Sequence, residues 1–478
     1  MPEAPTRGPA GARFVEGSIL RHVVVMSATG SVGLMAIFVV DLLSLLYVSK
    51  LGDPKLTAAV GFATIVQFFA IAINIGLMIA AGALVSRSIG AGDEAGGRRL
   101  ATSASLLGLM VSGLLVALML PLLDPLLRLI GAEGETLTVA KRFLWIALPS
   151  NLLMGPGMMF SGLLRAAGEA RQAMSVTLGG GLVTAFVDPL LIFGAGLGVD
   201  GAAYATCIAR LTFALIGWHY VRRRRMLGRP SLACLAADAP VVFRIALPAV
   251  LTNLAPSVAS GFIAHALSGF GPEAMAANVV IDRLTPVAFG GLFAMSGSIG
   301  PILGQNWGAR RFDRMRGVLR DGALVTASYV GVVWLALVLV REPLMRLFEL
   351  HDASGDLFAF FCLVSGAVWF FNGLLFLANA SFNNLGFPFL STVLNWGRAT
   401  LGTMPPALAG AALYGPRGVI AGVGVGSVLF GALGIGLAFG TVGRLERRAR
   451  ALDAASLPLP EEPDAEPAVE PARAGAPV

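Results

Sequence analysis

Twelve long apolar stretches run along the chain, and they constrain its fold more than any other feature. Only 13% of the residues are charged, against roughly 25% in soluble domains, so a water-soluble globule is excluded. An apolar segment of about 20 residues crosses a bilayer as a helix, and lipid admits only helices or closed barrels. The runs are too long for the alternating strands of a barrel. The sequence therefore predicts an all-α polytopic membrane protein.

The stretches lie near residues 18–48, 57–83, 101–130, 139–164, 172–195, 200–220, 242–268, 274–302, 319–340, 354–381, 389–411 and 418–441. If both termini face the cytoplasm, 24 of the 35 Lys and Arg residues lie at inner segments and eight at outer loops. This asymmetry satisfies the positive-inside rule and explains the net charge of +7 without nucleic acid. The first stretch is too long for a signal-peptide core. We expect a multi-pass protein of a bacterial inner membrane.

The two halves of the sequence resemble each other at a constant offset. Gly90 pairs with Gly308 and Gly168 with Gly386, both at 218 residues, and Gly201 pairs with Gly418 at 217. Six helices per half make a parallel repeat, related by a pseudo-twofold axis along the membrane normal. The predicted parts are an N-terminal tail (1–17), an N-lobe (18–220), a linker (221–241), a C-lobe (242–441) and a disordered C-terminal tail (442–478).

Two carboxylates stand inside predicted spans of the first half. Asp41 and Asp188 each lie seven residues before the outer end of their stretch, about 10 Å deep at 1.5 Å per residue. Thr184 precedes Asp188 by one turn, and Thr206 lies at a similar depth in the next stretch. The repeat maps Asp41 onto Ala259 and Asp188 onto Pro406, so the second half has no counterpart.

Ionisable residues inside the membrane are expensive and point to function. Two neighbouring carboxylates in a medium of low dielectric cannot both ionise cheaply. The pair could therefore bind and release a proton, or bind Na⁺ between Asp41, Asp188 and the Thr206 hydroxyl. A structural alternative is that the two acids bond backbone groups at helix breaks, since Pro189 frees a carbonyl.

The second half offers other polar and soft side chains. Asp282 and Arg283 are adjacent in one stretch and, at i and i+1, do not face each other, so each needs a partner elsewhere. We expect a substrate cavity lined by soft and polar side chains, for which the candidates are Met154, Met158, Asp282, Arg283, Met295, Trp369 and Asn372. Three scattered cysteines and four distant histidines predict no metal centre.

No phosphate-binding GxxxxGK[ST] motif or zinc-binding HExxH motif occurs in the sequence. Transport would then draw on an ion gradient or on another subunit, and we predict neither an enzyme nor a cofactor.

Several motifs resemble the multidrug and toxic compound extrusion (MATE) family, over residues 18–441. They are Val40-Asp41 followed by Leu51-Gly52, Leu164-Arg165-Ala166-Ala167-Gly168-Glu169, Val187-Asp188-Pro189 with Gly201-Ala202-Ala203-Tyr204-Ala205-Thr206, and Gly304-Gln305-Asn306-Trp307-Gly308-Ala309-Arg310. Acids confined to the first half are similar to its DinF-like branch. The resemblance implies a V-shaped cavity between two six-helix lobes, and drug export in exchange for protons or sodium.

Residue by residue, the resemblance implies that Asp41, Asp188 and Thr206 occupy the cation-coupling positions. Thr184 stands where the family usually has Asn. A proline common in the first helix of the family is absent, so bending there would use Gly30 and Gly33.

The resulting hypothesis is a monomeric antiporter that exports amphipathic, mostly cationic compounds in exchange for H⁺ or Na⁺. One alternative is a lipid-linked oligosaccharide flippase of the same superfamily, which would need a strongly cationic cavity. Only Arg283 and Arg398 fall in the right region for that. A second alternative is a structural or receptor-like membrane protein, which would not need buried carboxylates confined to one lobe.

Overall fold

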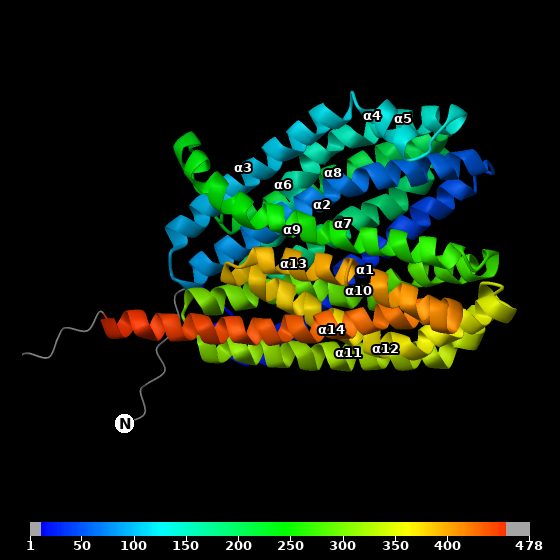
Figure 1. Cartoon of the computed structure of the whole chain (residues 1–478). Helices are drawn as coiled ribbons and strands as arrows, with labels where there is room; N and C mark the ends of the chain where they lie inside the picture. Colours follow the sequence, from blue (N-terminus) through cyan, green and yellow to red (C-terminus); the bar gives the residue numbers. More distant parts are fainter. Residues whose placement is uncertain (1–10, 456–478) are drawn as a thin grey trace, which may run out of the picture.

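The computed structural model describes residues 11–455, and every regular element in that range is helical. Long helices lie side by side and nearly parallel (Figure 1), as membrane spans do. Eleven helical runs between residues 19 and 453 are long and apolar enough to cross a membrane. The predicted all-α polytopic fold is therefore confirmed.

The elements are α1 (Ile19–Ser49), α2 (Pro54–Gly90), α3 (Glu94–Met119), α4 (Leu123–Leu129), α5 (Gly134–Ala147), η1 (Leu148–Ser150), α6 (Asn151–Ala166), α7 (Ala170–Pro189), η2 (Leu190–Gly194), α8 (Gly198–Arg223), α9 (Leu232–Ser268), α10 (Pro272–Gly308), α11 (Phe312–Leu347), α12 (Asp352–Leu385), α13 (Pro388–Ala399) and α14 (Met404–Ala455). Local signals begin and end several of them. Asp53 caps the Lys55 N–H of α2 just before a proline, Ser231 caps α9, and Gly386 ends α12 in the left-handed conformation, as such residues do.

The helix labelled α14 contains two antiparallel arms. Its backbone leaves the helical conformation at Tyr414 and Gly415, where the φ of Gly415 is +62°. Gly410 and Gly418, on either side of this break, contact each other so closely that neither has room for a side chain. The last apolar run, Pro388–Asp453, therefore holds two spans, and the twelve predicted spans are present.

The spans form two bundles that meet along four helices. Figure 1 shows α3 to α8 gathered on one side and α11, α12 and α14 on the other, with α1, α10 and α13 between them. The bundles are joined where α1 packs on α10 and where α2 packs on α9 and α10. Apolar clusters fill the inside of each bundle, and one buried cluster includes Leu77 and Met159 of the first bundle with Val242 of the second.

A close crossing of α2 and α10 closes one end of the molecule. A Cβ atom on Gly90 would collide with the backbone of Gln305, and one on Gly308 would collide with the carbonyl oxygen of Arg87. Each obstructing residue lies three positions before the glycine of its own helix, so the contact is reciprocal across the pseudo-twofold axis. Small residues let helix backbones approach in lipid. We call this end, where α1 begins and α2 and α10 finish, the basic end.

Residues 11–17 pack against this crossing. Phe14 is 3% exposed, and its N–H donates to the Gln305 side-chain oxygen at 3.0 Å. Arg314 donates to the carbonyl oxygens of Phe14, Glu16 and Gly17 at 2.9–3.1 Å. These contacts attach the segment to the second bundle.

The same segment also holds the first bundle, because Arg13 forms an ion pair with Glu169 at 2.7 Å. Residues 11–17 of the predicted N-terminal tail (1–17) are therefore packed against both bundles. The sequence signal was weak, because Phe14 and Val15 are too short an apolar run to mark a packed segment.

Two other predicted segments are helical in part. Between the lobes, the backbone is non-helical over residues 224–231, within the linker predicted at 221–241. The start of α9 is held by Asp238, which accepts from Ser103 at 2.7 Å and pairs with Arg99 at 3.1 Å. Helix α14 continues to Ala455, so the predicted C-terminal tail is helical over 442–455. The rest of that tail lies outside the described residues.

Gly90→Ala is expected to destabilise the protein, because its Cβ meets backbone atoms of Gln305 that cannot turn aside. Overpacking of this kind costs about 1–3 kcal/mol. Gly61→Ala is the matched control on the same helix, since its Cβ meets no atom within 4 Å and Ala is the better helix former. Thermal unfolding in detergent should show a lower Tm for Gly90→Ala and an equal or higher Tm for Gly61→Ala. Equal Tm values for Gly90→Ala and the unmodified protein would contradict the tight crossing.

Candidate functional site

The structure turns the face of α1 that carries Asp41 toward Asp188 of α7. Ser44 lies three residues after Asp41, hence on the same face of the helix. Its hydroxyl donates to a carboxylate oxygen (Oδ2) of Asp188. The charge of Asp188 also acts on the Asp41 carboxyl. The two acids that the sequence singled out thus share one region of the first bundle.

The two carboxyls differ in their surroundings. Asp188 is 1% exposed, whereas Asp41 is an exposed residue. The second carboxylate oxygen of Asp188, Oδ1, is buried without a hydrogen-bond partner in residues 11–455. Such an atom is costly to bury unless something binds it. A proton or a cation on Oδ1 would satisfy it.

The backbone around Asp188 is irregular. Pro189 cannot donate to the carbonyl of Ala185, and the chain continues as a π-helical turn over Leu190–Gly194. π-Helical turns are frequent at functional sites. Gly201 of α8 packs directly on the backbone of Leu191, which fixes the two helices close together just beyond the acid.

The two predicted hydroxyls are oriented by their own helices. The Thr184 hydroxyl donates to the Gly180 carbonyl at 3.1 Å, and the Thr206 hydroxyl donates to the Ala202 carbonyl at 2.9 Å. Their protons are therefore used, but each oxygen keeps lone pairs that can face a cation. Within residues 11–455, no hydrogen bond joins either hydroxyl to Asp41 or Asp188. The structure brings Asp41 and Asp188 together more directly than it does the threonines.

Sequence analysis missed two residues of this region, Ser44 and Arg210. Ser44 could have been found from its spacing of three after Asp41. Arg210 follows Thr206 by four residues on α8, and its charge acts on the Asp41 carboxyl. It lies inside a span, which is itself a functional signal. The spacing of residues along the chain gives no signal that relates Arg210 to Asp41, because the two residues lie on different helices.

The candidates of the second bundle gather on α10 and α12. Asp282 and Arg283 are both exposed, and the Asp282 carboxylate accepts from Asn278 at 3.2 Å. Trp369 stacks on Phe289, with ring centroids 4.7 Å apart and planes 10° apart. These residues place a carboxylate, a guanidinium and an aromatic group on the second bundle.

Other cavity candidates are more enclosed. Met154 and Met158 of α6 are half-buried, and Met158 packs against the cluster shared by both bundles. Asn372 is buried. Met295 is 2% exposed and lies in the core of the second bundle, where its sulfur faces the Thr326 hydroxyl at 3.7 Å. Met295 is therefore a buried packing residue in this structure, in an apolar cluster that also includes Met26 of α1, and its place in a substrate cavity stays a prediction.

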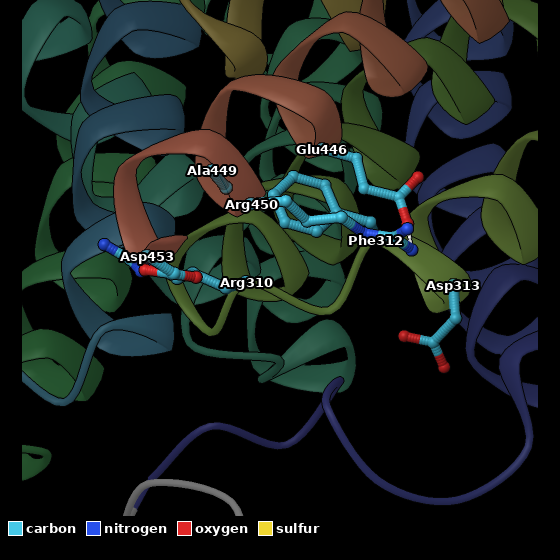
Figure 2. Close-up of a pocket in the computed structure, with 7 residues that line it drawn as sticks. All are labelled: Arg310, Phe312, Asp313, Glu446, Ala449, Arg450 and Asp453. Carbon is cyan, nitrogen blue, oxygen red and sulfur yellow. Dashed lines mark hydrogen bonds and ion pairs between the residues drawn. The ribbon is translucent and has the colours of Figure 1, made fainter. Parts of the chain in front are cut away.

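A cleft of about 370 Å³ lies at the basic end, between the start of α11 and the end of α14 (Figure 2). Ion pairs join the two helices there, between Arg310 and Asp453 and between Arg316 and Glu446. Neither Asp41 nor Asp188 lines this cleft, whose walls are mostly charged side chains with Phe312 and Ala449. Residues 11–455 contain no cluster of three or more His, Cys, Asp and Glu side chains that could hold a metal ion.

Comparison with known proteins places the chain among transporters. It is 28% identical to the FAD transporter of Shewanella oneidensis over 417 residues, covering 85% of this chain and 91% of that protein. It is 24% identical to the multidrug export protein MepA of Staphylococcus aureus, over 76% of this chain and 81% of that one. The fold matches the crystal structure of the Vibrio cholerae MATE transporter VcmN in the bent form, with a TM-score of 0.85 and 24% identity, over 90% of this chain and 98% of that one.

The MatE family model matches the chain twice, at residues 31–190 and 248–407. The two matches are 217 residues apart and of equal length, in agreement with the repeat read from the glycines. Together they cover well over half of the sequence. The chain therefore belongs to the MatE (MATE) family, whose members are multi-span membrane transporters of small molecules.

Proposed function

We propose that this protein is a secondary active exporter of the DinF-like branch, which expels amphipathic, mostly cationic compounds in exchange for protons. It acts as a monomer in a bacterial inner membrane, with both termini in the cytoplasm. It performs no covalent chemistry and needs no cofactor. Asp41 and Asp188 carry the coupling, Thr184 and Thr206 support it, and Na⁺ is the alternative coupling ion.

The observation that carries the proposal is the unpartnered oxygen of a buried carboxylate in the first bundle. Within residues 11–455, Asp188 Oδ1 accepts no hydrogen bond, while the Ser44 hydroxyl donates to Oδ2. Asp41 is exposed and lies on the same helix face as Ser44, whose hydroxyl donates to Asp188. A purely structural acid in lipid would have both oxygens bonded. This acid is instead half satisfied, as a site that loads and unloads a proton requires.

Coupling follows from one site that two ligands cannot fill together. When Asp41 and Asp188 are unprotonated, their negative field favours an organic cation in the space between the bundles. When a proton neutralises them, that field is lost and the cation is released. Each ligand must favour a different conformation, because a ligand that binds both states equally shifts neither.

The closed basic end supplies the second conformational element. If the positive-inside rule holds, this end faces the cytoplasm, and the contact of α2 with α10 seals the protein on that side. Opening would separate Gly90 from Gln305 and require residues 11–17 to leave one bundle. The half-buried Met154 and Met158, with Asp282 and Trp369, are the candidate substrate contacts.

A second candidate substrate class is an anionic nucleotide cofactor of the FAD type. The 28% identity to the Shewanella oneidensis FAD transporter over 85% of this chain favours it. Arginine guanidinium groups bind phosphates well, and two are placed for this. Arg283 is exposed on α10. Arg165 of α6 lies against α10, because its Nη1 atom is 3.3 Å from the place where a Cβ atom added to Gly297 would lie.

Asp41→Asn is expected to lower the rate of export driven by a pH gradient at least tenfold, because the amide cannot take up a proton. Ethidium movement in proteoliposomes, with proton and sodium gradients imposed separately, measures this. Asp53→Asn is the matched control, since it makes the same exchange at a helix N-cap where Asn serves equally well. Export by Asp41→Asn at the unmodified rate would refute the coupling role.

The substrate class is tested with the same vesicles. Under a proton gradient, we expect concentrative transport of ethidium and no concentrative transport of FAD. The opposite result would assign the protein to nucleotide cofactors. In that case Arg283→Gln should reduce FAD transport at least tenfold, because phosphate loses a charged donor.

A further inference from the structure

Residues 11–17, which we call the strap, are held on the second bundle through their backbone. The Gln305 side-chain oxygen accepts from the Phe14 N–H at 3.0 Å, and the Asn306 side chain donates to the Phe14 carbonyl at 3.1 Å. The Arg314 guanidinium donates to the same carbonyl and to two further carbonyls of the strap, at 2.9–3.1 Å. Five hydrogen bonds therefore fix the strap to α10 and α11.

The attachment of the strap to the first bundle is made at the turn between α6 and α7. Glu169 in this turn forms an ion pair with Arg13 of the strap at 2.7 Å. It forms a second ion pair, at 2.9 Å, with Arg224, which directly follows α8. The Glu169 side chain is 12% exposed and that of Arg13 is 52% exposed. Beside the pair, the Phe14 ring lies against Gly168, where an added Cβ atom would be 3.2 Å from it.

The two attachments differ in what each would leave behind on breaking. Release of Arg13 returns a half-exposed guanidinium to water, while Glu169 keeps Arg224 as its counterion. Release from the second bundle would instead take strap partners from the side chains of Gln305 and Asn306, which are both 0% exposed. Buried polar groups that lose a partner are costly. The attachment to the first bundle is therefore the weaker of the two.

Gln305 connects the strap to the closed crossing itself. Its side-chain oxygen accepts from Phe14, and its amide nitrogen donates to the Ala166 carbonyl at the end of α6 at 2.7 Å. Its backbone is also the surface against which Gly90 of α2 packs. The strap thus lies across the place where both α2 and α6 of the first bundle meet α10.

We propose that the strap is a latch of the basic end: it travels with the second bundle, and the Arg13–Glu169 ion pair is the contact that releases when the bundles part there. The inference rests on the proposed transport cycle, in which the basic end must open. It adds to that cycle a device that sets how readily this end opens. Arg224 has the complementary role, because it keeps Glu169 paired after the strap has left.

Opening of the basic end can be measured by labelling a buried cysteine. Ser86 of α2 is 0% exposed and its hydroxyl lies directly against Gly304 of α10, so Ser86→Cys reacts with a maleimide when the two helices separate. In detergent-purified protein, Arg13→Gln should raise the labelling rate about two- to fivefold, as the loss of one partly exposed ion pair allows. Arg224→Gln is the matched control and should leave the rate unchanged or lower it, because Glu169 would then have no arginine partner once the strap leaves.

These measurements use a chain in which the three natural cysteines, Cys207, Cys234 and Cys362, are replaced by alanine. Unfolding is monitored in a second chain that keeps Cys362 alone, because this residue is 0% exposed in an apolar cluster of the second bundle. Cys362 should label equally slowly with and without Arg13→Gln. If its labelling rises as well, the variant is unfolding and cross-linking carries the test.

Cross-linking tests which bundle the strap travels with. Arg13→Cys with Glu169→Cys, joined by a bifunctional methanethiosulfonate reagent, fastens the strap to the first bundle. Ethidium export by proteoliposomes under a proton gradient should then slow about tenfold or more, because opening would have to break the hydrogen bonds to the second bundle. Glu16→Cys with Arg314→Cys is the matched control, since the same reagent fastens the strap to the second bundle. Its export should continue at the rate of the same variant before treatment.

Three outcomes would overturn the inference. They are an unchanged labelling rate in Arg13→Gln, a rise in Arg224→Gln equal to that in Arg13→Gln, and a cross-linking result in which the first link leaves export unchanged or the second link stops it. Failure of the proposed function looks different. The unmodified protein would then export no ethidium, while the labelling rate of Ser86→Cys would still respond to Arg13→Gln.

Discussion

A hydrocarbon interior offers no hydrogen-bond partner, and this constraint organises the whole molecule. Helices satisfy the backbone, and polar side chains inside the bundle must find partners from other helices. Asp238 does so with Ser103 and Arg99, and Arg210 does so with three oxygen acceptors. Among the buried side-chain atoms without a hydrogen-bond partner in residues 11–455, Oδ1 of Asp188 is the carboxylate oxygen. An acceptor of this kind is the one for which the proposed function supplies a proton.

The two halves of the repeat share their packing but differ in their acidic residues. Gly90 and Gly308 meet reciprocally at the pseudo-twofold axis, and neither position tolerates a side chain. Two similar halves that touch at small residues can rock about such a contact without unpacking their cores. The carboxylates occur in one half only, since Ala259 and Pro406 stand at the equivalent positions. In the proposed mechanism, an ion bound there would act on the first bundle and leave the second available for substrate.

Periodicity and composition were enough to predict the helices and the twofold repeat, because both follow from hydrophobicity along the chain. Partners within one or two turns were also within reach, as the spacing of Asp41 and Ser44 illustrates. Contacts between distant segments were not. The burial of Phe14 depends on Gln305 and Arg314, nearly 300 residues away. Met295 was chosen as a soft side chain in a span, but only the rotation of α10 decides which neighbours it meets.

The sequence by itself determined that the chain crosses a membrane twelve times, that its halves are related, and that acids stand inside the first half. These properties are local, since each depends on the hydropathy of neighbouring residues or on the spacing between them. The tertiary structure decided that Ser44 donates to one oxygen of Asp188 while the other accepts no hydrogen bond within residues 11–455, and that Arg210 donates to oxygens of α2, α5 and η1. It also decided that residues 11–17 join the bundles. Such facts depend on how helices rotate and approach each other, and packing between remote segments sets those angles, which no local pattern encodes.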